Sequence, residues 1–212
     1  MKKVFIKKLN RLIELDNPLL CIKFEEPIIY REFVFDIFEN MIFSENNNEI
    51  DLNKYGQIIY NPYELSLTEK KLVSALYNIL QKNIKDEEMT LLSQIEKNLI
   101  ELLDNLFQKI TIPFEFDENI DINKLFSCIG VKYPVINKNS YFENLMLFIR
   151  IYTEVLHIKC FITLNLANLL SNDEKNKLNS FLNELDIVLI DCFVSEKSQK
   201  NDLIVDSEWC SI

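Results

Sequence analysis

Glycine is almost absent from this chain. Of 212 residues, only Gly56 and Gly130 are glycine, and neither lies near the other or opens a strand-to-helix turn. Loops that cradle a phosphate need several glycines at fixed spacing, because only then can backbone N–H groups approach the phosphate closely. Walker-type loops and dinucleotide fingerprints are therefore excluded, and we expect no bound nucleotide.

The composition is that of a folded globular protein, with 48% hydrophobic and 26% charged residues. A chain of this length fits one domain, or one domain that carries a large insertion. The cysteines are far apart and form no C-x-x-C pair, so we expect reduced thiols inside the cell. They are Cys21, Cys128, Cys160, Cys192 and Cys210.

From the sequence we expect neither an export signal nor a membrane span. The apolar residues of Met1–Leu15 are interrupted by Lys7, Lys8 and Arg11, which removes the apolar region of a signal peptide. The most apolar later stretch, Leu145–Leu170, contains charged residues and falls short of a spanning helix. We therefore expect a soluble, cytoplasmic protein without a membrane partner.

Strand-like runs gather towards the two ends of the chain, and helical patterns occupy the middle. The predicted strands are 12–15, 19–24, 58–60, 159–166, 187–190 and 203–205. The predicted helices are one marked by Val34 to Ile42, one that begins at Ser66, then 87–110, 122–129 ended by Gly130, 141–156 and 173–185. Three of them open with the S-x-x-E spacing of a capping box, at Ser66, Ser140 and Ser171.

The predicted helix 87–110 carries a narrow apolar seam about 35 Å long. Its members are Leu92, Ile95, Leu99, Leu102, Leu106 and Ile110. The seam fits two arrangements equally well: a long antiparallel helix hairpin that stands away from the sheet, or a helix that covers the sheet.

The order of elements predicts an α/β protein with one mostly parallel sheet contributed by both ends of the chain. The expected head domain comprises residues 1–65 and 150–212, and the expected inserted helical domain comprises residues 66–149. Ile187–Asp191 is an apolar strand followed by a carboxylate, as in the magnesium-holding strand of phosphate-loop enzymes. Without the glycine loop, a degenerate sheet of that architecture is the better interpretation.

Catalytic residues are scarce. His157 is the single histidine, so any Ser-His-Asp or Cys-His site would depend on it, and a metal site with two histidines is excluded. A histidine in the core or in an interface is the commoner case. We therefore expect no enzyme activity.

Four carboxylates lie within seven residues, at Glu115, Asp117, Glu118 and Asp121. Such an oxygen-rich, turn-rich segment suits calcium, which accepts six to eight oxygen ligands in flexible geometry. The spacing is not that of an EF-hand, and a solvated acidic turn explains the same residues. Both interpretations stay open.

The net charge of −10 does not favour a surface covered by nucleic acid. A basic concave face can nevertheless coexist with an acidic exterior. Basic residues cluster at Lys2, Lys3, Lys7, Lys8 and Arg11, and again at Lys132 and Lys138. Each cluster is also compatible with an ordinary solvated surface.

Three segments together resemble a known family. They are Leu20–Pro27 with Phe33–Phe38, Phe161–Leu166 leading into Leu169–Ser171, and Ile187–Asp191 with Ile204–Cys210. Their pattern over the whole chain is similar to the small accessory protein of the type II-A CRISPR adaptation module, whose members form rings around DNA. The chain resembles a divergent member.

The resemblance implies a head like a phosphate-loop ATPase that has lost nucleotide binding, with an inserted α-helical leg. It implies a calcium-dependent homotetrameric ring that binds ends of double-stranded DNA without sequence preference. It implies partners in spacer acquisition, namely the CRISPR integrase proteins and the type II-A effector nuclease. In that case Glu115, Asp117, Glu118 and Asp121 would bind calcium, and Lys7, Lys8, Lys132 and Lys138 would contact DNA.

Two other classes of function remain. The carboxylates of residues 115–121 could belong to a metal-dependent nuclease. Alternatively, the seam of helix 87–110 could belong to a helical protein-interaction module that does not bind DNA.

Overall fold

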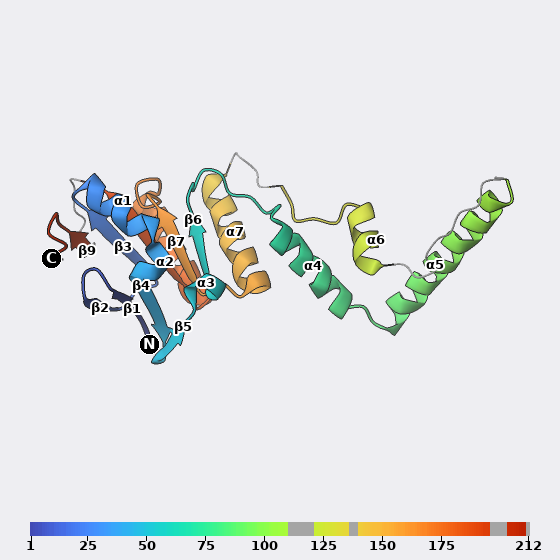
Figure 1. Cartoon of the computed structure of the whole chain (residues 1–212), viewed down its shortest axis with the longest axis horizontal. Helices are drawn as coiled ribbons and strands as arrows, with labels where there is room; N and C mark the ends of the chain where they lie inside the picture. The colour runs from blue at the N-terminus through green and yellow to red at the C-terminus, as the bar shows by residue number, and fades with distance from the viewer. Residues whose placement is uncertain (110–120, 136–139, 196–202, 211–212) are drawn as a thin grey trace. The chain divides into compact units, whose positions relative to one another are not determined.

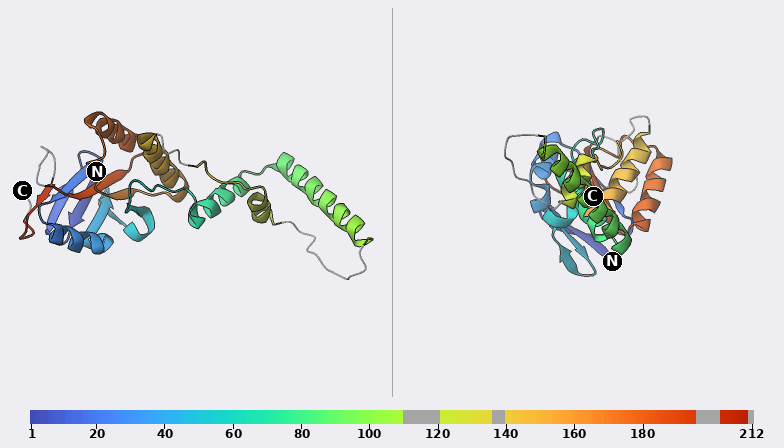
Figure 2. Two further views of the ribbon diagram at one scale, coloured as in Figure 1. Left: turned by 90° about the horizontal axis from the view of Figure 1, so that it is seen from above. Right: turned by 90° about the vertical axis from the view of Figure 1, so that its right-hand side faces the viewer.

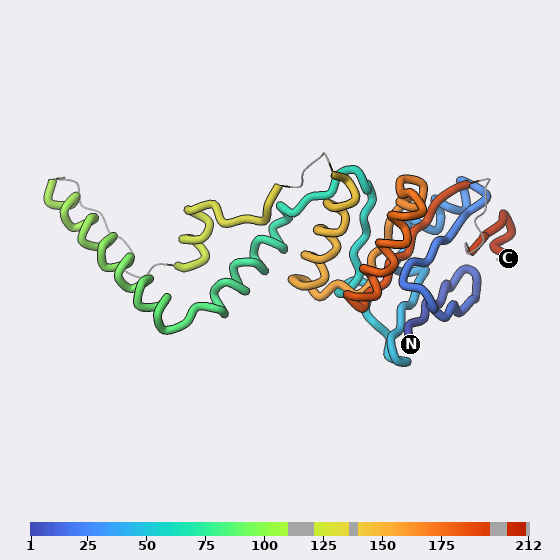
Figure 3. Tube along the Cα trace, turned by 180° about the vertical axis from the view of Figure 1, so that it is seen from behind, coloured from blue at the N-terminus to red at the C-terminus, as the bar shows by residue number. Residues whose placement is uncertain are grey.

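The computed structural model describes residues 1–109, 121–135, 140–195 and 203–210. The chain divides into two compact units: unit 1 is Met1–Leu67 with Val135–Ile212, and unit 2 is Thr68–Pro134. Figure 3 shows that both chain ends belong to unit 1. The C-terminal end of the inserted domain was predicted at residue 149, which lies inside α7 (Tyr141–Leu156). The structure assigns all of α7 to unit 1. Six residues of α7 are buried.

Unit 1 contains a five-stranded sheet in which all strand pairs are parallel. Its strands are β3 (Leu19–Phe24), β6 (Gly56–Ile59), β7 (Cys160–Leu164), β8 (Val188–Val194) and β9 (Leu203–Val205), in the order β6-β7-β8-β3-β9. Figure 1 shows the labelled strands with helices beside them. The predicted α/β class with a mostly parallel sheet is confirmed.

A second, antiparallel sheet of unit 1 was missed in the sequence. It has the order β2-β1-β4-β5, built from β1 (Lys2–Ile6), β2 (Arg11–Glu14), β4 (Met41–Glu45) and β5 (Asn48–Ile50). The helix predicted around Val34 to Ile42 is instead α1 (Pro27–Phe35) followed by the short α2 (Ile37–Asn40). Met41 and Ile42 belong to β4, where burial alternates with the period of a strand.

One hydrophobic core joins the two sheets. Val4 and Ile6 of β1 pack in the same cluster as Phe24 of β3, Phe33 of α1 and Ile190 of β8. Because neighbouring residues of a strand face opposite sides, Phe161 and Leu189 face the other side of the parallel sheet. There α7 and α8 (Asn172–Glu184) pack on each other, and α8 packs on β3 and β8 (Figure 2).

Both glycines occupy positions that need them. A Cβ atom on Gly56, which follows the short helix α3 (Leu52–Tyr55), would lie 2.4 Å from the carbonyl oxygen of Leu52. Gly130 has a φ of 75° directly after the end of α6 (Ile122–Cys128), which confirms the predicted helix end.

Unit 2 consists of α4 (Lys70–Lys82), α5 (Asp86–Phe107) and α6. The Tyr77 and Phe126 ring centroids are 5.7 Å apart, and the Tyr77 hydroxyl donates to the carbonyl oxygen of Val131 at 3.2 Å. The apolar face of α4 therefore packs on α6, while α5 has no buried residue. This differs from the helix hairpin that the sequence allowed.

Of the three predicted capping boxes, the structure contains the one at Ser171. At α8, Ser171 and Glu174 form the predicted capping box. Helix α4 begins at Lys70, four residues after Ser66, with Glu69 as its N-cap. At α7, Ser140 is the N-cap but its side chain makes no capping hydrogen bond. In the part of the chain that the structure describes, no helix has the length and hydropathy needed to cross a membrane.

Candidate functional site

Ligands of open α/β sheets bind at the carboxyl ends of the parallel strands, so a site is expected at this edge of the sheet. At this edge β3 ends at Phe24 and α1 begins at Pro27, so Glu25 and Glu26 form the whole connection. This turn contains no glycine and two exposed carboxylates. It has neither the length nor the charge to hold a phosphate at the start of α1.

Both carboxylate oxygens of Asp191 accept hydrogen bonds from neighbouring residues of unit 1. Its Oδ1 accepts hydrogen bonds from Thr163 Oγ1 at 2.8 Å and from the Leu166 N–H at 2.9 Å, and its Oδ2 accepts one from the Ala167 N–H at 2.7 Å. The residue is fully buried. Burial raises the pKa of this carboxyl to about 6, against the opposing effect of the three hydrogen bonds.

This arrangement corrects the interpretation of 187–191 as a strand that ends in a carboxylate. Strand β8 continues to Val194, so Asp191 is its fourth residue, opposite Thr163 of β7. Both carboxylate oxygens already have donors. Asp191 fixes the turn between β7 and α8, in which Asn165 has a φ of 67°.

Tyrosines lie around the same edge. Burial raises the pKa of Tyr30 to about 12 and raises the pKa of Tyr141 above its usual value. The ring of Tyr141 is 6.1 Å from that of Tyr63, centroid to centroid. Because their pKa values are raised, the hydroxyls of Tyr30 and Tyr141 keep their protons at neutral pH, so neither serves as a base.

His157 is exposed and lies at the C-cap of α7 with a φ of 57°. His157 is therefore not a core residue, and its place in an interface stays a prediction. Cys160, three residues later, is buried in β7, and burial raises its thiol pKa to about 12. A thiol with such a pKa carries almost no thiolate at neutral pH.

The predicted DNA contacts fall in both units. Lys7 and Lys8 lie in the exposed turn between β1 and β2, and Lys7 N–H donates to the carbonyl oxygen of Asn40. Lys8 Nζ donates to the carbonyl oxygen of Glu32 at 3.1 Å and sits 4.6 Å from the centroid of the Trp209 ring. Lys132 is exposed in unit 2, and Lys138 lies outside the described residues.

Of the predicted calcium ligands, Glu115, Asp117 and Glu118 lie outside the described residues. Asp121 is the N-cap of α6, and its Oδ1 accepts hydrogen bonds from the N–H groups of Asn123 at 2.9 Å and Lys124 at 3.3 Å. Within residues 1–109, 121–135, 140–195 and 203–210, no group of three or more His, Cys, Asp or Glu side chains is arranged to hold a metal ion.

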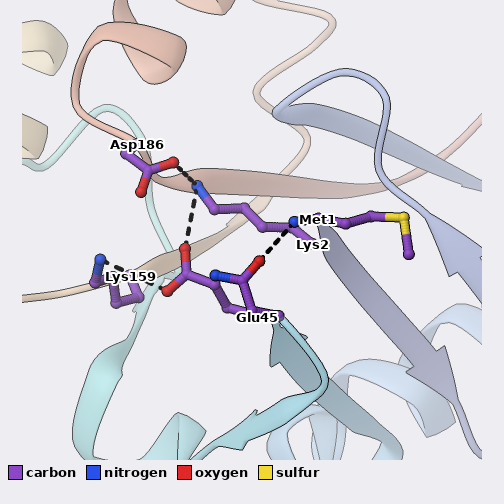
Figure 4. A network of polar contacts seen from close by, with 6 residues as sticks. Met1, Lys2, Glu45, Lys159 and Asp186 are labelled. Atoms are coloured by element: carbon purple, nitrogen blue, oxygen red, sulfur yellow. Dashed lines mark hydrogen bonds and ion pairs between the residues drawn. The ribbon is translucent and has the colours of Figure 1, made fainter.

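The sequence analysis missed an ionic network that joins Lys2 of β1 and Glu45, the last residue of β4, to Lys159 and Asp186, which precede β7 and β8 (Figure 4). Lys2 Nζ lies 2.7 Å from Asp186 Oδ1 and 3.8 Å from Glu45 Oε1, and Lys159 Nζ lies 3.8 Å from Glu45 Oε2. It also missed Lys23, which is 2% exposed because β3 lies between β8 and β9. Neither feature has a local sequence signature, since both depend on strand pairing.

A family model described as CRISPR-associated protein (Cas_Csn2) matches residues 36–209. The matched segment contains all of unit 2, while β1, β2, β3 and α1 precede it. A comparison with curated proteins finds no match. Because the family model covers well over half of the 212 residues, the chain belongs to the Cas_Csn2 family of CRISPR-associated proteins.

Proposed function

We propose that this protein is a non-catalytic, cytoplasmic DNA-binding protein of the CRISPR system. It forms a calcium-dependent homotetrameric ring around the ends of double-stranded DNA, without sequence preference. It acts in spacer acquisition beside the CRISPR integrase proteins and the type II-A effector nuclease. The observation that carries this proposal is the family match over residues 36–209.

The geometry of unit 1 supports a binding role. The β3–α1 turn consists of two residues, and both carry a carboxylate. The carboxylate of Asp191 accepts three hydrogen bonds from within unit 1. These features suit a sheet of phosphate-loop type that has lost its nucleotide. The parallel sheet with helices beside it supports the same relationship to that class of ATPase.

Surface properties of unit 1 support assembly and phosphate binding. Large apolar side chains are exposed at Leu12, Ile28, Phe35, Tyr60 and Tyr63. Ile28 and Phe35 line one surface hollow together, and such a joint apolar surface is suited to contacts between copies. Lys7 and Arg11 add exposed positive charge at the β1–β2 hairpin, as a phosphate contact requires.

A gel-shift experiment tests the proposal. Linear duplex DNA should bind in millimolar calcium, bind poorly in chelator, and lose affinity steeply with salt. Closed circular plasmid should compete far less than linear fragments, because a closed ring must be entered from a DNA end. Equal competition by circles would contradict ring threading.

The same reactions distinguish the nuclease alternative. Incubation with magnesium or manganese should leave the DNA intact if the protein only binds. Cleavage that disappears on substitution of Glu118 and Asp121 would instead support a metal-dependent nuclease.

A further inference from the structure

Lys23 is a buried cation inside unit 1. Only 2% of this residue is exposed, and it is the single Lys or Arg among the buried residues of the described chain. Other buried polar side chains are hydrogen-bonded, Asn40 to the carbonyl oxygen of Phe33 and Thr163 to Asp191. Within the described residues, Lys23 makes no hydrogen bond or ion pair. Its ammonium group therefore lacks the partner that a buried charge requires.

The strand register places Lys23 near the carboxyl edge of the parallel sheet. It is the fifth residue of β3, opposite Phe193 of β8 and Ile204 of β9. Because neighbours along a strand face opposite sides, Lys23 lies on the face opposite to Ile22 and Phe24, which belong to the core between the two sheets. The carboxyl edge is where ligands of open α/β sheets bind.

Carboxylates close to Lys23 along the chain or across the strands are exposed or hold other donors. Glu25 and Glu26 are exposed in the β3–α1 turn. Asp206, which follows β9, accepts two backbone N–H groups of its own turn. Asp191 of β8 accepts three hydrogen bonds from the turn between β7 and α8 and from β7. The charge of Lys23 is thus left for an anion that these residues do not supply.

The surroundings of Lys23 indicate the class of this anion. Phe193 is buried and Ile204 is half-buried, so the residues opposite Lys23 on both neighbouring strands are apolar. A lysine ammonium is a compact point charge without the planar fork of arginine, and it matches a single charged oxygen group. Glu25 and Glu26 at the same edge repel anions of high charge. A small ligand with one phosphate or carboxylate group fits these conditions better than a polyphosphate does.

Strand β9 controls access to Lys23. It has three residues and lies at the edge of the sheet, paired with β3. So short an edge strand opens at a lower free-energy cost than the sheet as a whole. Trp209 follows in the next turn, with Lys8 Nζ 4.6 Å from its ring centroid, so the fluorescence of Trp209 reports on the position of this segment.

We propose that Lys23 is the centre of an anion-binding site at the carboxyl edge of β3 and β9, for a small ligand with one phosphate or carboxylate group. The bound anion neutralises the buried ammonium and holds β9 against β3. This inference goes beyond the proposed function, because a duplex cannot reach a residue that is buried between strands.

Thermal unfolding of the full chain tests the proposal, with inorganic phosphate and acetate as separate probes. Sodium chloride at the same ionic strength is the reference. We expect the Tm to rise by about 3 °C in about 50 mM of the preferred anion relative to chloride. The fluorescence of Trp209 should change over the same range of concentration. A response to phosphate alone identifies a phosphate ligand, and a response to acetate alone identifies a carboxylate ligand.

Lys23→Met locates the site, because methionine keeps an unbranched apolar stem and removes the charge. In chloride this variant should have a Tm about 3 °C higher than wild type, since no unpaired charge is buried. It should lose the rise caused by the anion. Lys177→Met removes an exposed lysine of α8 and should respond to the anion as wild type does.

Three results would overturn the inference. The first is no response of wild type to either anion, and the second is an equal response of Lys23→Met, which would be a general salt effect. The third is a loss of stability in Lys23→Met that Glu196→Gln or Asp202→Asn reproduces, because a carboxylate of this chain would then be the partner. Glu196 and Asp202 lie outside the described residues.

DNA binding separates this inference from the proposed function. Linear duplex DNA should be shifted by Lys23→Met as it is by wild type. A variant that loses the anion response and still binds DNA supports the site at Lys23. Failure of the anion site and failure of the proposed DNA binding are therefore distinguishable.

Discussion

At the scale of single residues, Asp191 is the buried polar group with most consequence for unit 1. Its carboxylate accepts hydrogen bonds from Thr163, Leu166 and Ala167. Asp191→Ala would leave a hydroxyl and two backbone N–H groups buried without an acceptor. We expect this variant to lower the free energy of unfolding by about 3 kcal/mol, measured by urea denaturation.

Asp16→Ala is the matched control, because Asp16 is an exposed aspartate between β2 and β3. Its unfolding free energy should stay within about 0.5 kcal/mol of the wild-type value. If Asp191→Ala were as stable as this control, the carboxylate would not hold the turn between β7 and α8.

Asp186 gives a residue-scale prediction about pH. The hydrogen bond from Lys2 holds the pKa of Asp186 below its usual value. A carboxyl with a lowered folded-state pKa adds stability above its unfolded pKa, near 4, and loses it as pH falls through the folded pKa. Because 73% of this side chain is exposed, solvent screening limits the gain to about 0.5 kcal/mol.

Asp186→Asn should therefore reduce stability slightly at pH 7 and have no effect at pH 2.5, in parallel urea titrations. Asparagine is the suitable replacement because residue 186 has a φ of 53°, which Asn tolerates. A loss of equal size at both pH values would show that the ion pair is not its cause.

Residue-level prediction from the sequence succeeded where the signal is local. The Ser171–Glu174 capping box and the helix end at Gly130 depend on neighbours in the chain, and both were found. The Thr163–Asp191 hydrogen bond joins residues 28 positions apart and exists only through the register of β7 and β8. No local pattern specifies that register.

At the scale of elements, the sequence predicted most helices and all five strands of the parallel sheet, whereas β1, β4, β5 and α3 were missed. Helices α5, α7 and α8 and strands β3 and β9 lie close to their predicted positions, while β8 extends to Val194, beyond its predicted end. Strand β1 was missed because Lys2 and Lys3 fill two of its five positions and obscure the alternation. Strand β4 was assigned to a helix because Met41 and Ile42 continue the helical spacing of Val34, Ile37 and Phe38 across the end of α2.

The contact between the β1–β2 turn and the C-terminal turn gives an element-scale prediction. Lys8 Nζ lies 4.6 Å from the centroid of Trp209, the single tryptophan of the chain. Lys8→Met should cost about 0.5–1 kcal/mol of stability and change the fluorescence of Trp209. Lys7→Met, at the exposed neighbouring position, should leave that fluorescence unchanged.

These two variants also bear on DNA binding. Because Lys8 is engaged by Glu32 and Trp209, its ammonium is less available to a phosphate than that of Lys7. In gel shifts, Lys7→Met should weaken binding to linear duplex more than Lys8→Met does. The reverse order would mean that Lys8 leaves the Trp209 ring when DNA binds.

At the scale of the whole molecule, the sequence predicted an α/β unit made from both ends of the chain with a helical segment inserted between them. Helix α7 shows where this prediction reached its limit. Its side chains are apolar on nearly all sides, which fits either unit, and only the packing of residues such as Leu145 and Ile149 assigns it to unit 1.

The last prediction concerns calcium and assembly. Asp121 caps α6, so Asp121→Ala would remove the helix cap together with the charge. Asparagine is also a good N-cap, and the variant Glu118→Gln with Asp121→Asn therefore removes two charges while the cap is retained. If these carboxylates bind calcium, the variant should lose the tetramer in sedimentation and bind linear DNA at least tenfold more weakly in millimolar calcium.

Glu87→Gln with Glu101→Gln removes two charges from α5 and should behave as wild type. Wild-type protein in chelator should reproduce the Glu118→Gln, Asp121→Asn variant, because magnesium and monovalent ions do not satisfy flexible six- to eight-oxygen coordination. A variant that assembles and binds DNA like wild type would leave residues 115–121 as a solvated acidic turn.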